Sequence, residues 1–371
     1  MGACNVDDNG DDGGGDDGGS GGPTTAYDFD LSQQFEDIDD AFDTTPDDNP
    51  TTVEGVELGR HLFYDVRLSK NNTIACASCH KQENAFADPE QFSEGFEGKR
   101  TSRNSMSIVN MRWQSLFFWD GRANSLEEQV LMPVQDEIEM GMTLSEMTEK
   151  LKTIDIYPDM FESAFGTTEI TSDRVSKALS QFIRTLVSQN SKFDEAYGKS
   201  DAAIRQILST EEYLGYRLFI THVDPDYGSG INIPGSASRG ANCGDCHRTA
   251  LFTTSTFTNN GLDSLTTDAG YGDISGKNKF DGTFKTPTVR NIELTAPYMH
   301  DGRFATLEEV IEHYDEHVLD HKNLDSQISE AGNTWPGKLN LTDQEKAALI
   351  AFLKTLTDND LITNPKYASP F

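Results

Sequence analysis

Two short motifs constrain this chain more than any other feature of its sequence. Residues 76–80 read Cys-Ala-Ser-Cys-His, and residues 243–247 read Cys-Gly-Asp-Cys-His. Two thiols at this spacing reach the two vinyl groups of one haem, and the histidine that follows binds the iron from the same side. A zinc site made from both cysteine pairs is the alternative, but the pairs lie far apart in the sequence and each has its own histidine. We therefore expect two covalently bound haem c groups, attached through Cys76, Cys79, Cys243 and Cys246 and ligated by His80 and His247.

The charge of the chain limits which partners it can have. Its 371 residues are enough for two domains of ordinary size. With 62 acidic and 30 basic residues, the formal net charge is −32. Nucleic acids and anionic membrane surfaces repel such a chain, so we exclude both as partners and expect basic ones.

The N-terminal segment holds much of this negative charge. Residues 1–50 contain 15 Asp or Glu and no Lys or Arg, within a sequence rich in Gly and Asp. Because such a segment offers almost nothing apolar to bury, we predict a disordered acidic tether over residues 1–50.

The fifth cysteine, Cys4, belongs to neither motif. Residues 2–4 read Gly-Ala-Cys and resemble the end of a bacterial lipoprotein signal, which predicts a lipid anchor at Cys4; an incidental exposed thiol is the alternative. The secretory signal of an exported cytochrome is missing, so we read the start as truncated, and no apolar run approaches the roughly 18 residues of a membrane span. We expect an exported protein in the periplasm or at the cell surface, with membrane contact only through the anchor.

An internal repeat organises the rest of the chain. Leu-Gly-Arg-His-Leu-Phe at 58–63 and Leu-Gly-Tyr-Arg-Leu-Phe at 214–219 precede the two motifs, and residues 119–128 match residues 300–309. Helix signals dominate, with capping boxes at 143–146 and 342–345 and an amphipathic helix over 172–187. We predict a mainly α fold of two cytochrome c-like haem domains related by internal duplication, over residues 51–200 and 201–371, with a polar link near 188–209.

From residue 58 to about 357 the chain resembles the bacterial dihaem cytochrome c peroxidases, including the related enzyme that matures methylamine dehydrogenase. Besides the haem motifs, the residues that carry the resemblance are 58–63, 67–69, 103–104, 118–122, 139–140, 286–291 and 297–302. The resemblance implies that hydrogen peroxide reacts at the first haem and is reduced to water. Electrons from a small basic redox protein, a cytochrome c or a cupredoxin, would enter through the second haem.

The resemblance also implies three catalytic residues. Trp119 matches the indole between the two haems, while Gln129 and Glu139 match the glutamine and glutamate over the peroxidatic iron. A positioned carboxyl can take a proton from one peroxide oxygen and give it to the other. Glu127 and Glu128 are the rivals of Glu139, which could also be a solvated surface acid, and Trp119 could be a core residue. Arg122 and Arg303 could pair with haem propionates or form ordinary salt bridges.

The sixth ligands of the two irons are expected to differ from those of many relatives. Where those relatives close the first iron with a loop histidine, this chain has Phe96, and it has no histidine between His80 and His222. We therefore predict an open first haem. For the second haem, alignment to the family favours Tyr314, whereas Met299 is the alternative by its thioether chemistry, followed by His313 and His317.

The family also binds a calcium ion between its domains. The side chain of Asn104 and the main-chain carbonyls of Thr295 and Pro297 match its protein ligands, and hard oxygen donors suit this ion. A homodimer is left open. Two other functions also stay open: a dihaem enzyme that oxidises Trp or Tyr side chains of a partner protein, and a non-catalytic surface electron-transfer cytochrome.

Overall fold

The computed structural model describes residues 24–221, 240–254, 256–329 and 339–371. Within these ranges the structure is rich in helix, and its strands β1 and β2 are two residues long each, which confirms the mainly α prediction. In the same ranges no helix is both long and apolar enough to cross a membrane. Cys4, with its predicted lipid anchor, lies outside the described residues. The elements in chain order are α1 (Gln33–Phe42), α2 (Val53–Tyr64), α3 (Cys76–Cys79), α4 (Leu126–Gln129), α5 (Met132–Gln135), α6 (Leu144–Lys152), α7 (Ile156–Phe165), α8 (Ser172–Arg184), α9 (Asp201–Ile207), α10 (Thr210–Ile220), β1 (Phe257–Thr258), α11 (Tyr271–Ser275), β2 (Phe284–Lys285), α12 (Leu307–Glu312), α13 (Ser326–Ser329), α14 (Asp343–Lys354) and α15 (Asn359–Thr363).

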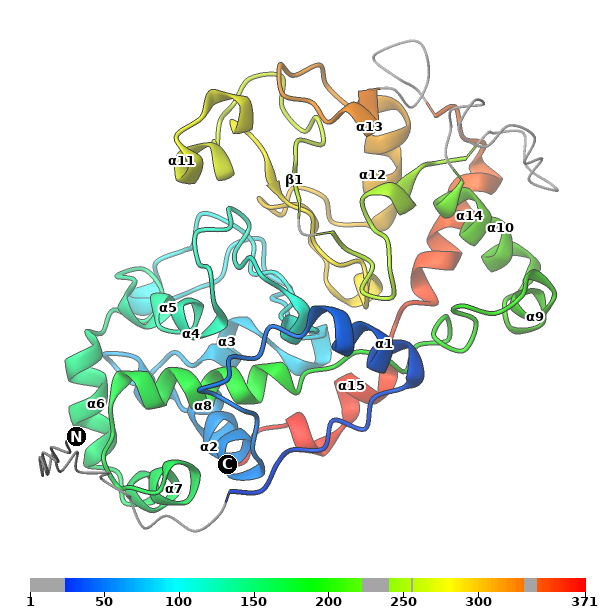
Figure 1. The fold of residues 1–371 in the computed structure, drawn as a ribbon. Helices are drawn as coiled ribbons and strands as arrows, with labels where there is room; N and C mark the ends of the chain where they lie inside the picture. The colour runs from blue at the N-terminus through cyan, green and yellow to red at the C-terminus, as the bar shows by residue number, and fades with distance from the viewer. Residues whose placement is uncertain (1–23, 222–239, 255, 330–338) are drawn as a thin grey trace, which may run out of the picture.

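The first half of the molecule is built around the packing of α2 against α8 (Figure 1). Leu58, Leu62 and Phe63 share the buried face of α2, and their side chains are fully enclosed in the core of this half. The helices meet so closely at Gly59 that a Cβ there would lie 2.0 Å from the carbonyl oxygen of Ala178. Glycine is therefore required at this position.

The second half repeats this arrangement with α10 and α14. Leu218 and Phe219 of α10 are buried in a separate core that contains Phe352 of α14. A Cβ at Gly215 would lie 1.9 Å from the carbonyl oxygen of Ala348. The two helix pairs thus make the same close contact at positions that the sequence repeat relates.

The two halves are joined through loops that carry functional motifs. The carbonyl oxygen of Trp119 accepts a hydrogen bond from the backbone of Lys285 at 2.7 Å, and that of His300 accepts one from the backbone of Asn104 at 2.8 Å. The guanidinium of Arg103, in the first half, pairs with Asp268 in the second half at 2.8 Å. The site residues of the two halves are therefore held against one another.

The predicted disordered tether over residues 1–50 is wrong for its described part. Residues 33–42 form α1, which lies at the junction of the two halves (Figure 1). Phe35 is fully buried in a cluster with Trp113 and Leu251, and Arg112 pairs with Asp39 at 2.6 Å. The prediction weighed the acidic residues and overlooked the apolar ones among them, whose burial holds the segment in place.

The domain boundaries also need correction. The C-terminal segment, assigned to the second domain, returns to the first half, where Leu361 and Tyr367 join its core. Conversely, Phe193 and Ala196, assigned to the first domain, are buried in the core of the second. Residues 201–207 of the predicted polar link form α9. Each segment packs with the half whose core buries its apolar side chains, whatever its position in the sequence.

The helix signals are confirmed with one adjustment. Both predicted capping boxes are present, with the side chains of Thr143 and Thr342 accepting from the backbone at Glu146 and Glu345. The amphipathic helix predicted to reach residue 187 ends at Arg184.

Candidate functional site

The first Cys-x-x-Cys-His motif forms the short helix α3 and the residue after it. Cys76 and Cys79 are free thiols, and His80 follows directly with its backbone amide bonded to the carbonyl of Cys76. The ring atom Nδ1 of His80 lies 2.9 Å from the carbonyl oxygen of Phe86. Because a carbonyl only accepts, Nδ1 carries the proton and the lone pair of Nε2 is left for a metal.

The second motif repeats this arrangement in the other half. Nδ1 of His247 lies 3.1 Å from the carbonyl oxygen of Pro287 and 3.3 Å from that of Phe252. Burial lowers the pKa of His247 to about 4, so the ring is neutral at ordinary pH, as an iron ligand must be. Both motifs therefore present two thiols and a preoriented imidazole.

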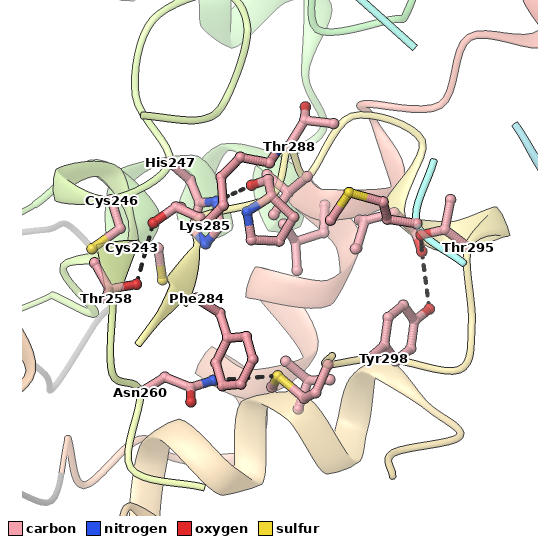
Figure 2. Close-up of a pocket in the computed structure, with 18 of the residues that line it drawn as sticks. Cys243, Cys246, His247, Thr258, Asn260, Phe284, Lys285, Thr288, Thr295 and Tyr298 are labelled. Atoms are coloured by element: carbon pink, nitrogen blue, oxygen red, sulfur yellow. Dashed lines mark hydrogen bonds between the residues drawn. The ribbon is translucent and has the colours of Figure 1, made fainter. Parts of the chain in front are cut away.

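A cavity of about 240 Å³ adjoins the second motif (Figure 2). Cys243, Cys246 and His247 line it together with many apolar side chains, among them Phe219, Leu262 and Leu349. Trp119 and Asn104 also line it, although they belong to the first half of the chain. The cavity is therefore shared between the two halves.

The residues around this cavity fit a haem. Its walls are mainly apolar, as a porphyrin ring requires. Lys285 is 3% exposed and lines the cavity, and burial lowers its pKa to about 8. Within the described ranges no hydrogen bond or ion pair to its ammonium group is found, so a carboxylate in the cavity would satisfy it. A haem carries two propionate carboxylates.

Tyr314 and Met299, the two leading candidates for the sixth ligand of the second haem, both line this cavity. Tyr314 lies in a single π-helical turn, residues 313–317, that follows α12. Burial raises the pKa of its phenol to about 12 in the absence of a metal. His313 donates from Nε2 to the backbone oxygen of Asn260 at 3.0 Å, and His317 is exposed beside Glu312. Of the four candidates, Tyr314 and Met299 line the cavity, and His313 and His317 do not.

Trp119 is fixed at the junction of the halves. Its indole Nε1 donates to the carbonyl oxygen of Asn104 at 2.9 Å. The ring centroid lies 6.5 Å from that of His300, which stacks on Phe284 at 3.8 Å. Trp119 and His300 occupy matching positions of the sequence repeat, and their rings meet edge to face, with an angle of 71° between their planes. These contacts place the indole at the junction of the two halves, where it lines the cavity beside the second motif.

Glu139 lies beside the first motif. Burial raises its pKa to about 7, with a further rise from Asp136 and an opposing effect of Arg122. Its charge also acts on the thiols of Cys76 and Cys79, whose pKa values burial raises to about 12 and about 11. The carboxyl is therefore close to the first haem site and ready to exchange protons near neutrality.

The rivals of Glu139 are engaged elsewhere. Glu127 pairs with the buried guanidinium of Arg184 at 2.7 Å, and Glu128 accepts from the backbone of Asn124 at the start of α4. Gln129 is half-buried at the end of the same helix. Arg122 and Arg303 both make salt bridges, to Asp120 at 3.0 Å and to Asp301 at 2.6 Å.

The loop that carries Phe96 is fastened to the backbone of Glu139. The amide of Phe96 donates to the carbonyl oxygens of Ile138 at 2.7 Å and Glu139 at 2.9 Å. A Cβ on Gly95 would lie 2.1 Å from the carbonyl oxygen of Ile138, and the ring of Phe96 packs on Gly141. The loop therefore supports the segment that carries Glu139, the candidate proton carrier.

The three predicted calcium ligands are all among the residues that line the cavity. Asn104, Thr295 and Pro297 all line it, the first from one half and the other two from the other. The amide nitrogen of Asn104 donates to the carbonyl oxygen of Glu90 at 3.1 Å, which leaves its side-chain oxygen to face a cation.

Three cavity residues escaped the sequence analysis. None of the three, Lys285, Asn260 and His300, was assigned a role, although Lys285 directly precedes residues 286–291 and His300 lies within residues 297–302 and matches Trp119 in the repeat. The repeat was thus the available signal for His300, and nothing in the sequence marked Asn260.

Comparison with known proteins finds relatives that cover most of this chain. A model of the di-haem cytochrome c peroxidases matches residues 53–202. The methylamine utilization protein MauG of Methylophilus methylotrophus is 32% identical over 311 residues, covering 84% of each chain. The cytochrome c551 peroxidase of Nitrosomonas europaea is 32% identical over 313 residues, covering 83% of this chain and 81% of that one. Among solved structures, a MauG-like protein associated with microbial copper homeostasis has a TM-score of 0.78 at 33% identity, covering 93% of this chain and 99% of that one.

Proposed function

Since the chain belongs to the dihaem cytochrome c peroxidase family, which includes MauG-type proteins, we propose that it reduces hydrogen peroxide to water with electrons from a small redox protein. Membership of the family implies haem cofactors, peroxide as substrate and a redox partner. The observation that carries the specific proposal is the carboxyl of Glu139, which lies beside the first motif with a pKa of about 7.

The side chains of the first half handle the protons of the reaction. A haem held by Cys76, Cys79 and His80 supplies the iron at which the O–O bond of peroxide breaks. Converting one peroxide into two waters also consumes two protons and two electrons. Glu139 takes the proton from one oxygen and returns it to the other, while Gln129 orients the peroxide through its amide.

The second half passes on the electrons. Cys243, Cys246 and His247 would hold the second haem, and Tyr314, or alternatively Met299, would supply a further protein ligand to its iron. Lys285, which lines the cavity, would pair its ammonium group with a propionate of this haem. Trp119, fixed by Asn104 and by the backbone of Lys285, carries electrons across the junction of the halves.

Several further features belong to the same proposal. The two halves arose by duplication, which the matching contacts of Gly59 and Gly215 support. A calcium ion bound by Asn104, Thr295 and Pro297 joins them at the cavity wall. The haems are attached covalently, and the protein is exported to the periplasm or cell surface with a lipid anchor at Cys4.

A stopped-flow experiment tests the reaction. The oxidised, haem-loaded protein is mixed with hydrogen peroxide, and a reduced small cytochrome c is then added. We expect the absorption of the first haem to change as soon as peroxide is mixed in, because Phe96 leaves the first iron open. The added donor should then be oxidised at once. A reaction that starts only after reduction of the second haem would contradict an open first site.

One observation favours a second candidate function. Tyr314 is half-buried and lines the cavity, and a tyrosinate ligand favours the oxidised state of iron. An enzyme of this kind could oxidise Trp or Tyr side chains of a partner protein instead of a small donor. Rapid reaction with peroxide followed by slow oxidation of every small donor tested would favour this second function.

A further inference from the structure

One side chain contacts both candidates for the sixth ligand of the second haem. The amide nitrogen Nδ2 of Asn260 lies 3.3 Å from the phenol oxygen of Tyr314 and 3.4 Å from the sulfur of Met299. All three side chains line the cavity beside the second motif. Figure 2 shows Asn260 and its contact to the sulfur on the opposite side of the opening from His247.

The orientation of this amide follows from its partners. A thioether sulfur can only accept a hydrogen bond, so the nitrogen of the Asn260 amide, and not its oxygen, must face Met299. A tyrosine bound to iron is a phenolate, which also only accepts. One NH₂ group, with two N–H donors, can therefore serve both side chains at once. The backbone oxygen of Asn260 meets His313 at 3.0 Å, which fixes the residue from behind.

The two hydrogen bonds have opposite consequences for the two candidates. An N–H donor pairs with the oxygen of a phenolate and so holds Tyr314 in the orientation of a ligand. A donor on the sulfur occupies electron density that Met299 would use to bind iron. The same amide thus supports one ligand and withholds the other.

We propose that Asn260 is a positioning residue that selects the ligand of the second haem, holding Tyr314 ready to bind as a phenolate and keeping the sulfur of Met299 away from the iron. This inference rests on the proposed function, because it needs a haem at the second motif with a protein ligand opposite His247. Asn260 itself does not touch the iron.

The test compares the haem-loaded wild-type protein with Asn260→Leu, which keeps the branched shape of the side chain and removes both N–H donors. The readouts are the phenolate-to-iron charge-transfer band of the oxidised protein and the reduction potential of the second haem. Without its donor the phenolate gives more charge to the iron, so we expect a displaced band and a lower potential. Reduction should then allow Met299 to bind, seen as a new low-spin spectrum that the double variant Asn260→Leu, Met299→Leu lacks.

The matched control is Met299→Leu alone, which leaves the contact between Asn260 and Tyr314 in place. It should change neither the band nor the potential. Should Asn260→Leu load haem poorly, Asn260→Asp keeps the shape of the side chain and also removes the donors, and it must lower the potential as well.

Three outcomes separate the possibilities. An unchanged band and potential in both Asn260 variants would overturn the role of Asn260 and leave the proposed peroxidase function standing. A methionine-ligated second haem in the wild-type protein would also overturn it, because the contact with Asn260 would then not keep the sulfur of Met299 away from the iron. Failure of the wild-type protein to react with peroxide contradicts the proposed function, and the band and potential still decide the role of Asn260.

Discussion

At the scale of single residues, burial changes what Glu139 can do. A carboxyl with an ordinary pKa is ionised at neutral pH and returns a proton poorly, whereas Glu139 has a pKa of about 7. Burial is the main cause, with Asp136 adding to it. The same shift affects stability, since the folded state prefers the protonated form. The contribution of this shift to the free energy of unfolding is complete below the usual pKa of 4.5 and is lost as the pH rises through about 7.

Replacing Glu139 by Gln should slow the reaction with peroxide by about 100- to 10,000-fold, the usual contribution of a general acid–base group. In the wild-type protein the rate should rise with pH through about 7, because the carboxyl must be ionised to accept the first proton. Stopped-flow rates between pH 5 and 9 check both statements. Glu128→Gln, at the exposed start of α4, is the control, and a variant Glu139→Gln that keeps the wild-type pH profile would contradict the assignment.

Lys285 should set the potential of the second haem. The Lys285→Met variant removes a buried positive charge and keeps a side chain of similar length. A nearby positive charge disfavours the oxidised haem more than the reduced haem, so its removal should lower the reduction potential. Spectroelectrochemical titration measures this. Lys322→Met removes an exposed charge that pairs with Asp281, and it should leave the potential unchanged. Equal potentials in all three proteins would exclude an ion pair between Lys285 and a propionate.

Sequence reasoning at this scale succeeded where chemistry demands fixed spacing. Two thiols and a histidine must be adjacent to hold one haem, so residues 76–80 and 243–247 could be recognised from the sequence. The side chains that line a cavity need no fixed spacing in the sequence. Lys285, Asn260 and His300 meet around the second motif from distant parts of the chain, and only their packing makes them neighbours.

At the scale of elements, each half depends on one close helix crossing. Gly59→Ala and Gly215→Ala would each place a methyl group about 2 Å from a carbonyl oxygen, at 2.0 and 1.9 Å. The helices must separate to relieve the contact, so we expect each variant to lower the free energy of unfolding by about 1–3 kcal/mol. Thermal unfolding of the haem-loaded variants measures this loss. Ser145→Ala on the exposed surface of α6 is the control, and a stability equal to wild type in either glycine variant would contradict a tight crossing.

Elements with strong local signals were predictable, and those that depend on distant partners were not. The capping boxes at Thr143 and Thr342 satisfy backbone donors within four residues, so the sequence marks them directly. Helix α1 has no such local support. It is held by Trp113, Arg112 and Leu251, which the sequence places far from it, and its many acidic residues favoured a prediction of disorder.

At the scale of the whole molecule, chain order and spatial order differ. The C-terminal segment packs on the first half, where the carbonyl of Tyr367 accepts from the hydroxyl of Tyr64 at 2.7 Å and that of Ala368 from Arg60 at 2.9 Å. Helix α1 covers the junction of both halves. The halves are therefore linked by more than the cavity that they share. A repeat in the sequence predicts that two similar units exist, but it carries no information about the segments outside the repeat.

The net charge of the molecule predicts how it meets its electron donor. At −32, the chain attracts a basic cytochrome c over long distances, and dissolved salt screens that attraction. The second-order rate of donor oxidation should therefore fall as ionic strength rises, whereas the rate with uncharged peroxide should not. Only six of the 62 acidic residues precede residue 24, so a chain that begins there should keep most of this dependence. Loss of the salt effect on truncation would place the attraction in the N-terminal segment, and a donor rate that ignores salt in both proteins would contradict electrostatic attraction altogether.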